Sequence, residues 1–479
     1  MSHKPDRQRP GITLAVLSLG CLAYALLQSL VAPALPEMQR DLHTSESGAT
    51  WILTAYLLSA SVATPLLGRL GDIHGKERVL VWVLVGLGVG TLVSALATSL
   101  PVMLAGRVVQ GAGGGVFPLA FGIIRDEFPR NRVAGSIGLV SAILGIGAGV
   151  GIVLSGVLAD NLSYHWLFWV PLVAVVVATV ATALFVPESP VKAPARLNWS
   201  AAALLSAGLT AVLLAVSEAP TWGWGSARTL GLAAVGVLVL VVWVLAELRS
   251  AEPLVDMRVM RLRGVWTTNL AAFLVGMGMY NSFILIPQLA ELPKEAGFGF
   301  DASVTGAGLF MVPSTAMMLL VGPAAGRLER RFGSKPPLVA GAIFAAAAFG
   351  LLTFAHGAHV DVYAASTLLG IGIGLAFAAM ANLIVEAVPP DQTGVATGIN
   401  TIARTVGGAL GSQVVASILA GSVVASTGFP SEHSFTVSFA VTTGALLLGA
   451  LAAMAIPGRP RFEVAEAREP AGVREAEAA

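Results

Sequence analysis

The chain has 479 residues, of which 56% are hydrophobic and 11% are charged, with a formal net charge of +1. Soluble domains carry about 25% charged residues, so this chain cannot cover a water-facing surface of its own size. The composition therefore excludes a soluble globular protein and predicts an integral membrane protein, while the net charge gives no indication of nucleic-acid binding.

Apolar segments long enough to cross a bilayer, which takes about 20 helical residues, recur along the whole chain. Lys4, Arg7 and Arg9 precede the first of them in the manner of a signal peptide. The apolar run continues too far for a signal core, so we expect an uncleaved first helix. The fourteen predicted helices span 11–33, 50–68, 79–98, 101–123, 133–159, 165–186, 200–217, 228–247, 264–290, 303–325, 337–356, 361–385, 394–420 and 434–456.

Basic residues are distributed unevenly over the loops between these helices. If the N-terminus lies inside, the outer loops hold only Arg40, Arg228 and Lys294, and most of the 28 Lys and Arg residues lie on the inner side. Because cytoplasmic loops carry the excess of positive charge, we expect both termini to be cytoplasmic. The expected location of the protein is the plasma membrane, as a multi-pass protein.

A charged, glycine-punctuated hairpin occurs twice. Residues 68–78 read GRLGDIHGKER, and residues 326–335 read GRLERRFGSK, each between two apolar segments. Such a repeat is typical of an internally duplicated membrane protein.

The repeat predicts two six-helix bundles separated by an additional helix pair. The expected divisions are a cytoplasmic N-tail at 1–10, an N-terminal bundle at 11–186, a linker with two extra helices at 187–263, a C-terminal bundle at 264–456 and a disordered tail at 457–479.

Further motifs accompany the first hairpin in order: ALPE at 34–37, WILTAY at 51–56, RVVQG at 107–111 and YHWLF at 164–168. Together they resemble the major facilitator superfamily, and the fourteen-helix layout resembles its QacA/EmrB-type drug:proton antiporters. The resemblance implies an all-α major facilitator fold of 6 + 2 + 6 helices and a transporter rather than an enzyme.

Two departures from that family's pattern weaken the expectation of antiport. The first helix has Leu27 where the family usually has an aspartate, and the fifth has GIVLSG at 151–156 where the family usually has G-P-x-x-G-G.

The first hairpin carries the predicted gating residues. Gly68 and Gly75 are expected to permit a tight turn, and Asp72 to cap or pair with the end of a neighbouring helix. The resemblance implies that this network latches an outward-open state; the alternative is a static topology anchor. The gating set is Gly68, Asp72, Gly75, Lys76, Arg78 and Asp126.

Two arginines, Arg107 and Arg404, lie within apolar helices. An arginine facing lipid costs on the order of 3 kcal/mol, so we expect both to face a cavity or a hydrogen-bond partner. Glu37 and Asp41 are the carboxylates nearest to Arg107, and these three residues are the proton-coupling candidates. Two alternatives stay open: the arginines bind an anionic group of the substrate, or backbone carbonyls and water satisfy them.

Polar residues at otherwise apolar depth are candidates for lining a substrate cavity, although such residues also hold helices together by hydrogen bonds. They are Tyr24, Gln28, Gln110, Asn269, Tyr280, Asn281, Asn400 and Arg404.

The predicted function is proton-coupled efflux of amphiphilic drugs or natural products by alternating access. The alternatives are a uniporter or symporter of an organic anion and, in another class, a membrane sensor that moves nothing. We expect a small organic substrate, protons and the lipid bilayer as partners, no nucleic acid, no cofactor, no metal site, and a monomer.

Overall fold

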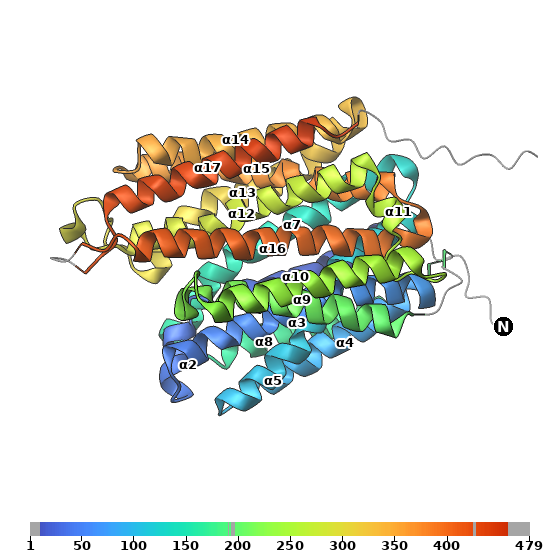
Figure 1. The fold of residues 1–479 in the computed structure, drawn as a ribbon, viewed down its shortest axis with the longest axis horizontal. Helices are drawn as coiled ribbons and strands as arrows, with labels where there is room; N and C mark the ends of the chain where they lie inside the picture. Colours follow the sequence, from blue (N-terminus) through green and yellow to red (C-terminus); the bar gives the residue numbers. More distant parts are fainter. Residues whose placement is uncertain (1–9, 190, 193–196, 425–427, 458–479) are drawn as a thin grey trace, which may run out of the picture.

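The computed structural model describes residues 10–189, 191–192, 197–424 and 428–457, and the regular elements of this part are all helices (Figure 1). The α-helices are α1 (Pro10–Ser29), α2 (Leu35–Asp41), α3 (Glu46–His74), α4 (Lys76–Ala95), α5 (Leu100–Gln110), α6 (Val116–Glu127), α7 (Arg130–Asn161), α8 (Trp166–Phe185), α9 (Trp199–Trp222), α10 (Ala227–Arg249), α11 (Met257–Met260), α12 (Arg263–Glu291), α13 (Val304–Phe332), α14 (Lys335–Phe354), α15 (His359–Ala387), α16 (Thr393–Ala420) and α17 (Glu432–Met454). Short 3-10 turns are η1 (Gly111–Gly115), η2 (Lys294–Ala296) and η3 (Pro390–Gln392).

Within the described residues, fourteen segments are long and apolar enough to cross a membrane. The helices α5 and α6 count as one span, since only the glycine-rich turn η1 separates them. The prediction of an all-helical protein with fourteen spanning helices is therefore confirmed.

Serine side chains begin several of these helices. The hydroxyls of Ser45, Ser226, Ser303 and Ser431 each accept a hydrogen bond from the backbone N–H three residues further on. This is the N-cap arrangement that satisfies one of the unpaired donors at a helix start.

The first hairpin is shorter than its sequence predicted, because α3 continues to His74. Gly75 alone makes the turn, with a φ of 104° that a side chain would strain. Gly68 lies inside α3, so the prediction that both glycines form the turn is wrong for Gly68. Its backbone is instead in close contact with Gly394 of α16, where a β-carbon on Gly68 would collide with the Gly394 carbonyl.

The helices before and after the central pair α9–α10 form two halves, which meet mainly along two helix pairs, α7 with α13 and α3 with α16. Small residues allow these close contacts. A β-carbon on Gly138 of α7 would lie 2.7 Å from the carbonyl oxygen of Gly322 on α13, and one on Gly326 would lie 2.8 Å from the backbone nitrogen of Gly135. We call the end of the molecule that carries the turns at Gly75 and Gly333 the hairpin end.

The helix α9 packs against both α3 and α16, and α10 packs against α9 (Figure 1). Leu205 of α9, Trp243 of α10 and Val255 in the following loop form one apolar cluster with Leu66 of α3 and Ile402 of α16. The extra pair therefore covers the α3–α16 contact near the hairpin end.

The close contact at Gly68 gives a testable expectation. A Gly68→Leu substitution should lower the midpoint of thermal unfolding by several degrees, because overpacking a tight contact costs about 1–3 kcal/mol. Unfolding can be followed by the reaction of a thiol-specific dye with Cys21, the one cysteine of the chain, which is fully buried.

Gly231→Leu is the matched control, since nothing lies within 4 Å of a β-carbon at that position of α10. Equal midpoints for the two variants would contradict the importance of the Gly68–Gly394 contact.

Candidate functional site

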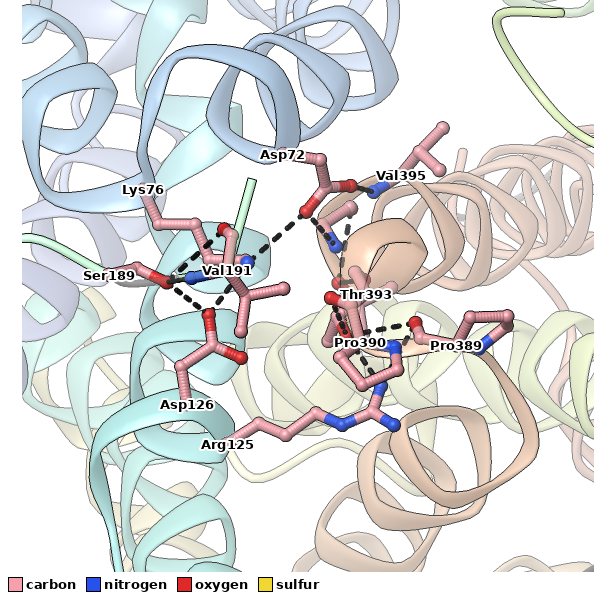
Figure 2. Close-up of polar contacts among 12 residues, drawn as sticks. Asp72, Lys76, Arg125, Asp126, Ser189, Val191, Pro389, Pro390, Thr393 and Val395 are labelled. Atoms are coloured by element: carbon pink, nitrogen blue, oxygen red, sulfur yellow. Dashed lines mark hydrogen bonds and ion pairs between the residues drawn. The ribbon is translucent and has the colours of Figure 1, made fainter. Parts of the chain in front are cut away.

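At the hairpin end, one carboxylate of the first half binds the start of a helix in the second half (Figure 2). The backbone N–H groups of Gly394 and Val395, in the first turn of α16, donate to the two Asp72 oxygens at 3.1 and 3.0 Å. The N-terminus of a helix offers unpaired N–H donors and a positive dipole end, and both favour an anion. Asp72 is fully buried, so water does not compete with these bonds.

A lysine of the same hairpin balances the buried negative charge. The Lys76 Nζ lies 2.7 Å from Asp126 Oδ2 and 3.6 Å from Asp72 Oδ1, and its side chain is fully buried. The hydroxyl of Ser189 donates to the same Asp126 oxygen. A buried ion pair offsets its desolvation only when its remaining groups are also hydrogen-bonded, and this network meets that condition.

A second charged contact between the halves comes from Arg125 of α6 (Figure 2). Its guanidinium donates to the Val388 carbonyl at 2.8 Å, to the Thr393 hydroxyl at 2.5 Å and to the Pro389 carbonyl at 3.3 Å. The two carbonyls directly follow the C-terminus of α15, which is the negative end of its dipole. Asp72 and Arg125 thus place a negative charge at a helix start and a positive charge at a helix end of the opposite half. We call these two contacts the latch.

Arg125 is not among the residues that the sequence motifs single out. It stands beside Asp126 at the end of a spanning helix, a place where basic residues also serve as plain topology anchors. Nothing local separates the two roles, because the carbonyls that Arg125 contacts lie more than 260 residues away.

Arg78 lies outside this network. Its Nη2 is 3.5 Å from Glu188 Oε1, and both side chains are largely exposed, at 55% and 42%. An exposed pair of this kind contributes little to stability. Arg78, a member of the predicted gating set, therefore pairs with Glu188 and not with Asp72 or Asp126 in this conformation.

Arg107 is fully buried in the first half. Its Nε donates to the Ile52 carbonyl at 3.0 Å, its Nη1 donates to Gln110 Oε1 at 2.7 Å, and the guanidinium lies 4.2 Å from the ring centre of Tyr56. Its Nη2 has no hydrogen-bond partner among the described residues. The backbone carbonyl that the sequence left open as an alternative partner is therefore one of its contacts.

The two carboxylates expected near Arg107 lie elsewhere. Glu37 Oε1 accepts a hydrogen bond from the Tyr164 backbone N–H at 3.0 Å, and Asp41 is exposed. Burial, and then the charges of Asp41 and Glu37, raise the pKa of Tyr164. The predicted pairing of Arg107 with either carboxylate is therefore absent from this conformation.

A pocket lies between the two halves. Its walls come from α6 and α7 of the first half and from α15 and α16 of the second, and the residues that line it are Phe117, Phe121, Ser141, Leu144, Phe377, Ala381, Thr397, Asn400, Thr401 and Arg404. We call this the central pocket. The Arg404 guanidinium lies 4.5 Å from the ring centre of Phe377, and in the described part of the chain it forms no ion pair.

Some of the predicted cavity residues meet at or near this pocket. Asn400 donates to the side chain of Asn269 at 2.9 Å, and Gln28 donates across the halves to the Tyr280 hydroxyl at 3.2 Å. The ring of Tyr24 lies 5.9 Å from that of Phe117, a pocket residue.

Two of the predicted cavity residues hold helices together instead. Gln110 bridges Arg107 and the Thr91 hydroxyl, and Asn281 donates to the Thr442 hydroxyl of α17 at 2.9 Å. Both side chains are almost fully buried. Their assignment as cavity lining is wrong for this conformation.

The latch predicts the effect of removing one charge. Asp72→Asn keeps the shape but loses the charge–dipole attraction, which we expect to cost about 1–2 kcal/mol and to open the hairpin end five- to thirtyfold more often. The measurement is the rate at which a membrane-impermeant maleimide, added at the hairpin end, modifies Thr401→Cys in a Cys21→Ala background.

The matched control for this experiment is Asp41→Asn, which removes an exposed carboxylate away from the latch. An unchanged labelling rate in Asp72→Asn would show that the latch does not hold the hairpin end closed.

Comparison with known proteins agrees with this architecture. Residues 17–412 match the sequence model of the Major Facilitator Superfamily. The chain is 30% identical to the tetracenomycin C resistance and export protein of Streptomyces glaucescens, covering 88% of this chain and 79% of that protein. It is 26% identical to the multidrug transporter protein MdtP of Bacillus subtilis, covering 88% and 77%.

A solved structure shares the fold. The human organic anion transporter MFSD10 superposes with a TM-score of 0.68 at 18% identity, covering 93% of this chain and 99% of that one. Fourteen spanning helices, a pocket between two halves and a sequence match over most of the chain agree with one another. The chain belongs to the Major Facilitator Superfamily, as a multi-pass protein of the plasma membrane.

Proposed function

We propose that the protein exports amphiphilic drugs or natural products, driven by protons, and that it transports them without chemical conversion. The central pocket is the observation that carries this proposal. Helices of both halves line it, its walls combine phenylalanine rings with hydroxyl, amide and guanidinium groups, and the latch closes one side of it. Apolar walls with a few polar groups suit an amphiphilic ligand. The names of the drug and antibiotic exporters that the chain resembles support the same substrate class.

In this proposal, the hairpin end faces the cytoplasm. Lys76, Arg78, Arg125 and the basic residues of the second hairpin lie at this end, as the positive-inside distribution requires. The conformation with an intact latch is then closed to the cytoplasm.

Alternating access follows from how the halves are held. The contacts at the latch are charge-assisted hydrogen bonds of about 1.5–3 kcal/mol each, and the glycine contacts between α7 and α13 are closely packed but not bonded. Rocking of the halves would break the latch and leave the networks inside each half intact. Lys76 would then keep its bond to Asp126, because both belong to the first half.

The residues that line the central pocket include no carboxylate that could bind the coupled proton. Arg107 contacts neither Glu37 nor Asp41 in this conformation. A coupling role for these three residues therefore requires Arg107 to exchange the Ile52 carbonyl for a carboxylate in another conformation.

Transport of an organic anion is the second candidate function. It is favoured by Arg404, which lines the central pocket and has no ion-pair partner among the described residues. It is also favoured by the leucine at position 27, where the family usually has an aspartate. A positive charge in a pocket of low polarity attracts anions strongly.

Efflux from proteoliposomes separates these functions. Under an imposed pH gradient, a proton-driven exporter should accumulate a fluorescent amphiphilic dye against its concentration difference, and a protonophore should abolish this accumulation. Flux down the concentration difference that ignores the pH gradient would indicate a uniporter. The proposal of a transporter fails if reconstituted protein moves none of the tested dyes.

The charge preference is tested at Arg404. If it binds an anionic group, Arg404→Gln should reduce transport of an anionic dye by about ten- to hundredfold, because a charged hydrogen bond of about 1.5–3 kcal/mol is lost, and should spare a cationic dye. Arg404→Lys keeps the charge and should restore part of the anion transport. Equal losses for both dyes in both variants would indicate that Arg404 has a structural role instead.

A further inference from the structure

The second hairpin holds two acidic residues close together at the hairpin end. Glu329 lies near the end of α13, and Glu386 lies near the end of α15. The hydroxyl of Ser334, just after the turn at Gly333, lies 3.5 Å from Glu329 Oε2 and 3.4 Å from Glu386 Oε1, and so links the two carboxylates. Glu329 is 5% exposed, and its Oε1 has no hydrogen-bond partner among the described residues.

The corresponding place in the first half contains a cation. Counting from the glycine that opens each hairpin, Ser334 stands where the first half has Lys76. Glu386 corresponds to Asp126, because each lies three residues before a proline at the end of an equivalent helix. Lys76 pairs with Asp126 at 2.7 Å. In the described part of the second half, neither Glu329 nor Glu386 forms an ion pair. Two facing carboxylates without a cation cannot both stay ionised at low cost.

The charges around this site do not replace the missing lysine. The basic residue whose charge acts on Glu329 is its neighbour Arg330, which is exposed. The one whose charge acts on Glu386 is Arg125, but its guanidinium is engaged in the latch. Other charged residues lie at the hairpin end of the neighbouring elements, and all of them are exposed or only partly buried. They are Arg327 and Arg331 of α13, Lys335 of α14, Arg130 and Arg132 of α7, Arg263 of α12 and Asp391 of η3.

A single amide joins this site to the contact between the halves. The Asn382 Nδ2 donates at 2.5 Å to Glu329 Oε2 and at 3.3 Å to the Ala134 carbonyl of α7 in the first half. One turn before Glu329, Gly326 is packed against Gly135 of α7. Glu329 is therefore buried by the same contact that closes the hairpin end, and separation of α7 from α13 would admit water to it.

We propose that Glu329 and Glu386 form a proton-binding site that holds one proton between them while the hairpin end is closed and releases it when the halves separate there. The site rests on the proposed alternating access, but it is separate from the central pocket and from Arg107. Its ligand is a proton because Glu329 Oε1 lacks a hydrogen-bond donor. The amide of Asn382 already donates to Glu329 Oε2, and a proton on one of the two carboxyl groups supplies the missing donor.

The site makes closure dependent on pH. Glu329 lies beyond the spanning part of α13, which ends at Gly322, and burial, followed by the charge of Glu386, raises the pKa of Glu329 to about 8. In the open state, water reaches Glu329 and its pKa returns toward the ordinary value of about 4.3. At a pH between these two pKa values, closing of the hairpin end is therefore coupled to the uptake of a proton. In this range the ratio of closed to open protein should fall by up to about tenfold per pH unit as the pH rises, and it should level off above about pH 8.

The test measures closure directly, without substrate or gradient. Spin labels at His74→Cys and Pro336→Cys, both exposed positions near the hairpin end, report the distance between the halves in a Cys21→Ala background, from about pH 5 to about pH 9. The closed population should decrease with rising pH in this parent protein. In Glu329→Gln, which mimics the protonated acid, the population should stay at its low-pH level throughout.

Ser334→Lys is the matched second variant, because it restores the lysine that the first half has. It should also keep the hairpin end closed at high pH, by pairing with the carboxylates in place of the proton. Glu295→Gln, an exposed acid in η2, should keep the pH response of the parent.

The proposal is overturned if the parent shows no pH response, or if a folded Glu329→Gln or Ser334→Lys protein retains the full response of the parent. These outcomes leave the efflux experiment untouched, and absent efflux in proteoliposomes would reject the transporter without changing the result of this distance measurement.

Discussion

The closed hairpin end depends on a match between buried charge and helix dipole. Asp72 lies at the start of α16 and Arg125 lies at the end of α15, so that the first half contributes the sign that each terminus of the second half attracts. Both helix termini would otherwise leave unpaired backbone groups away from water, at a cost comparable to lost hydrogen bonds. The contact is thus stabilising only when the halves are in register, since donors and acceptors on a helix end have fixed directions.

Close backbone packing makes this match possible. Gly68 is one turn before Asp72, and its contact with Gly394 brings the Asp72 carboxylate within hydrogen-bond distance of the first turn of α16. A side chain at Gly68 would move the two helices apart and lengthen the bonds of Asp72. Gly68 and Asp72 therefore act together: Gly68 sets the distance between α3 and α16, and Asp72 supplies the charge.

The sequence allowed the fold to be predicted because the relevant signals are local. Runs of apolar residues define fourteen spans whatever their neighbours are, and the structure has them. The partners of polar residues are a different matter. Gln110 and Asn281 have the polarity of cavity residues, but their side-chain amides donate to the hydroxyls of Thr91 and Thr442 on adjacent helices. Arg125 was missed for the converse reason, since its acceptors are backbone carbonyls that every residue carries. Which of these roles a residue has depends on which helix faces it, and that is set by packing of the whole chain.

The duplication helps where single residues do not, because the two hairpins can be compared position by position. The first half encloses a lysine between acids and uses a carboxylate to bind the opposite half. The second half encloses a serine between two glutamates and reaches the opposite half through an amide. In the first half, the charge of Asp72 forms the latch with the start of α16. The proton-binding site that we propose for the other half would give a contact whose strength follows the pH at the hairpin end. In the proton-driven exporter that we propose, closure of the hairpin end would then be held by the latch and adjusted by the ion that drives the cycle.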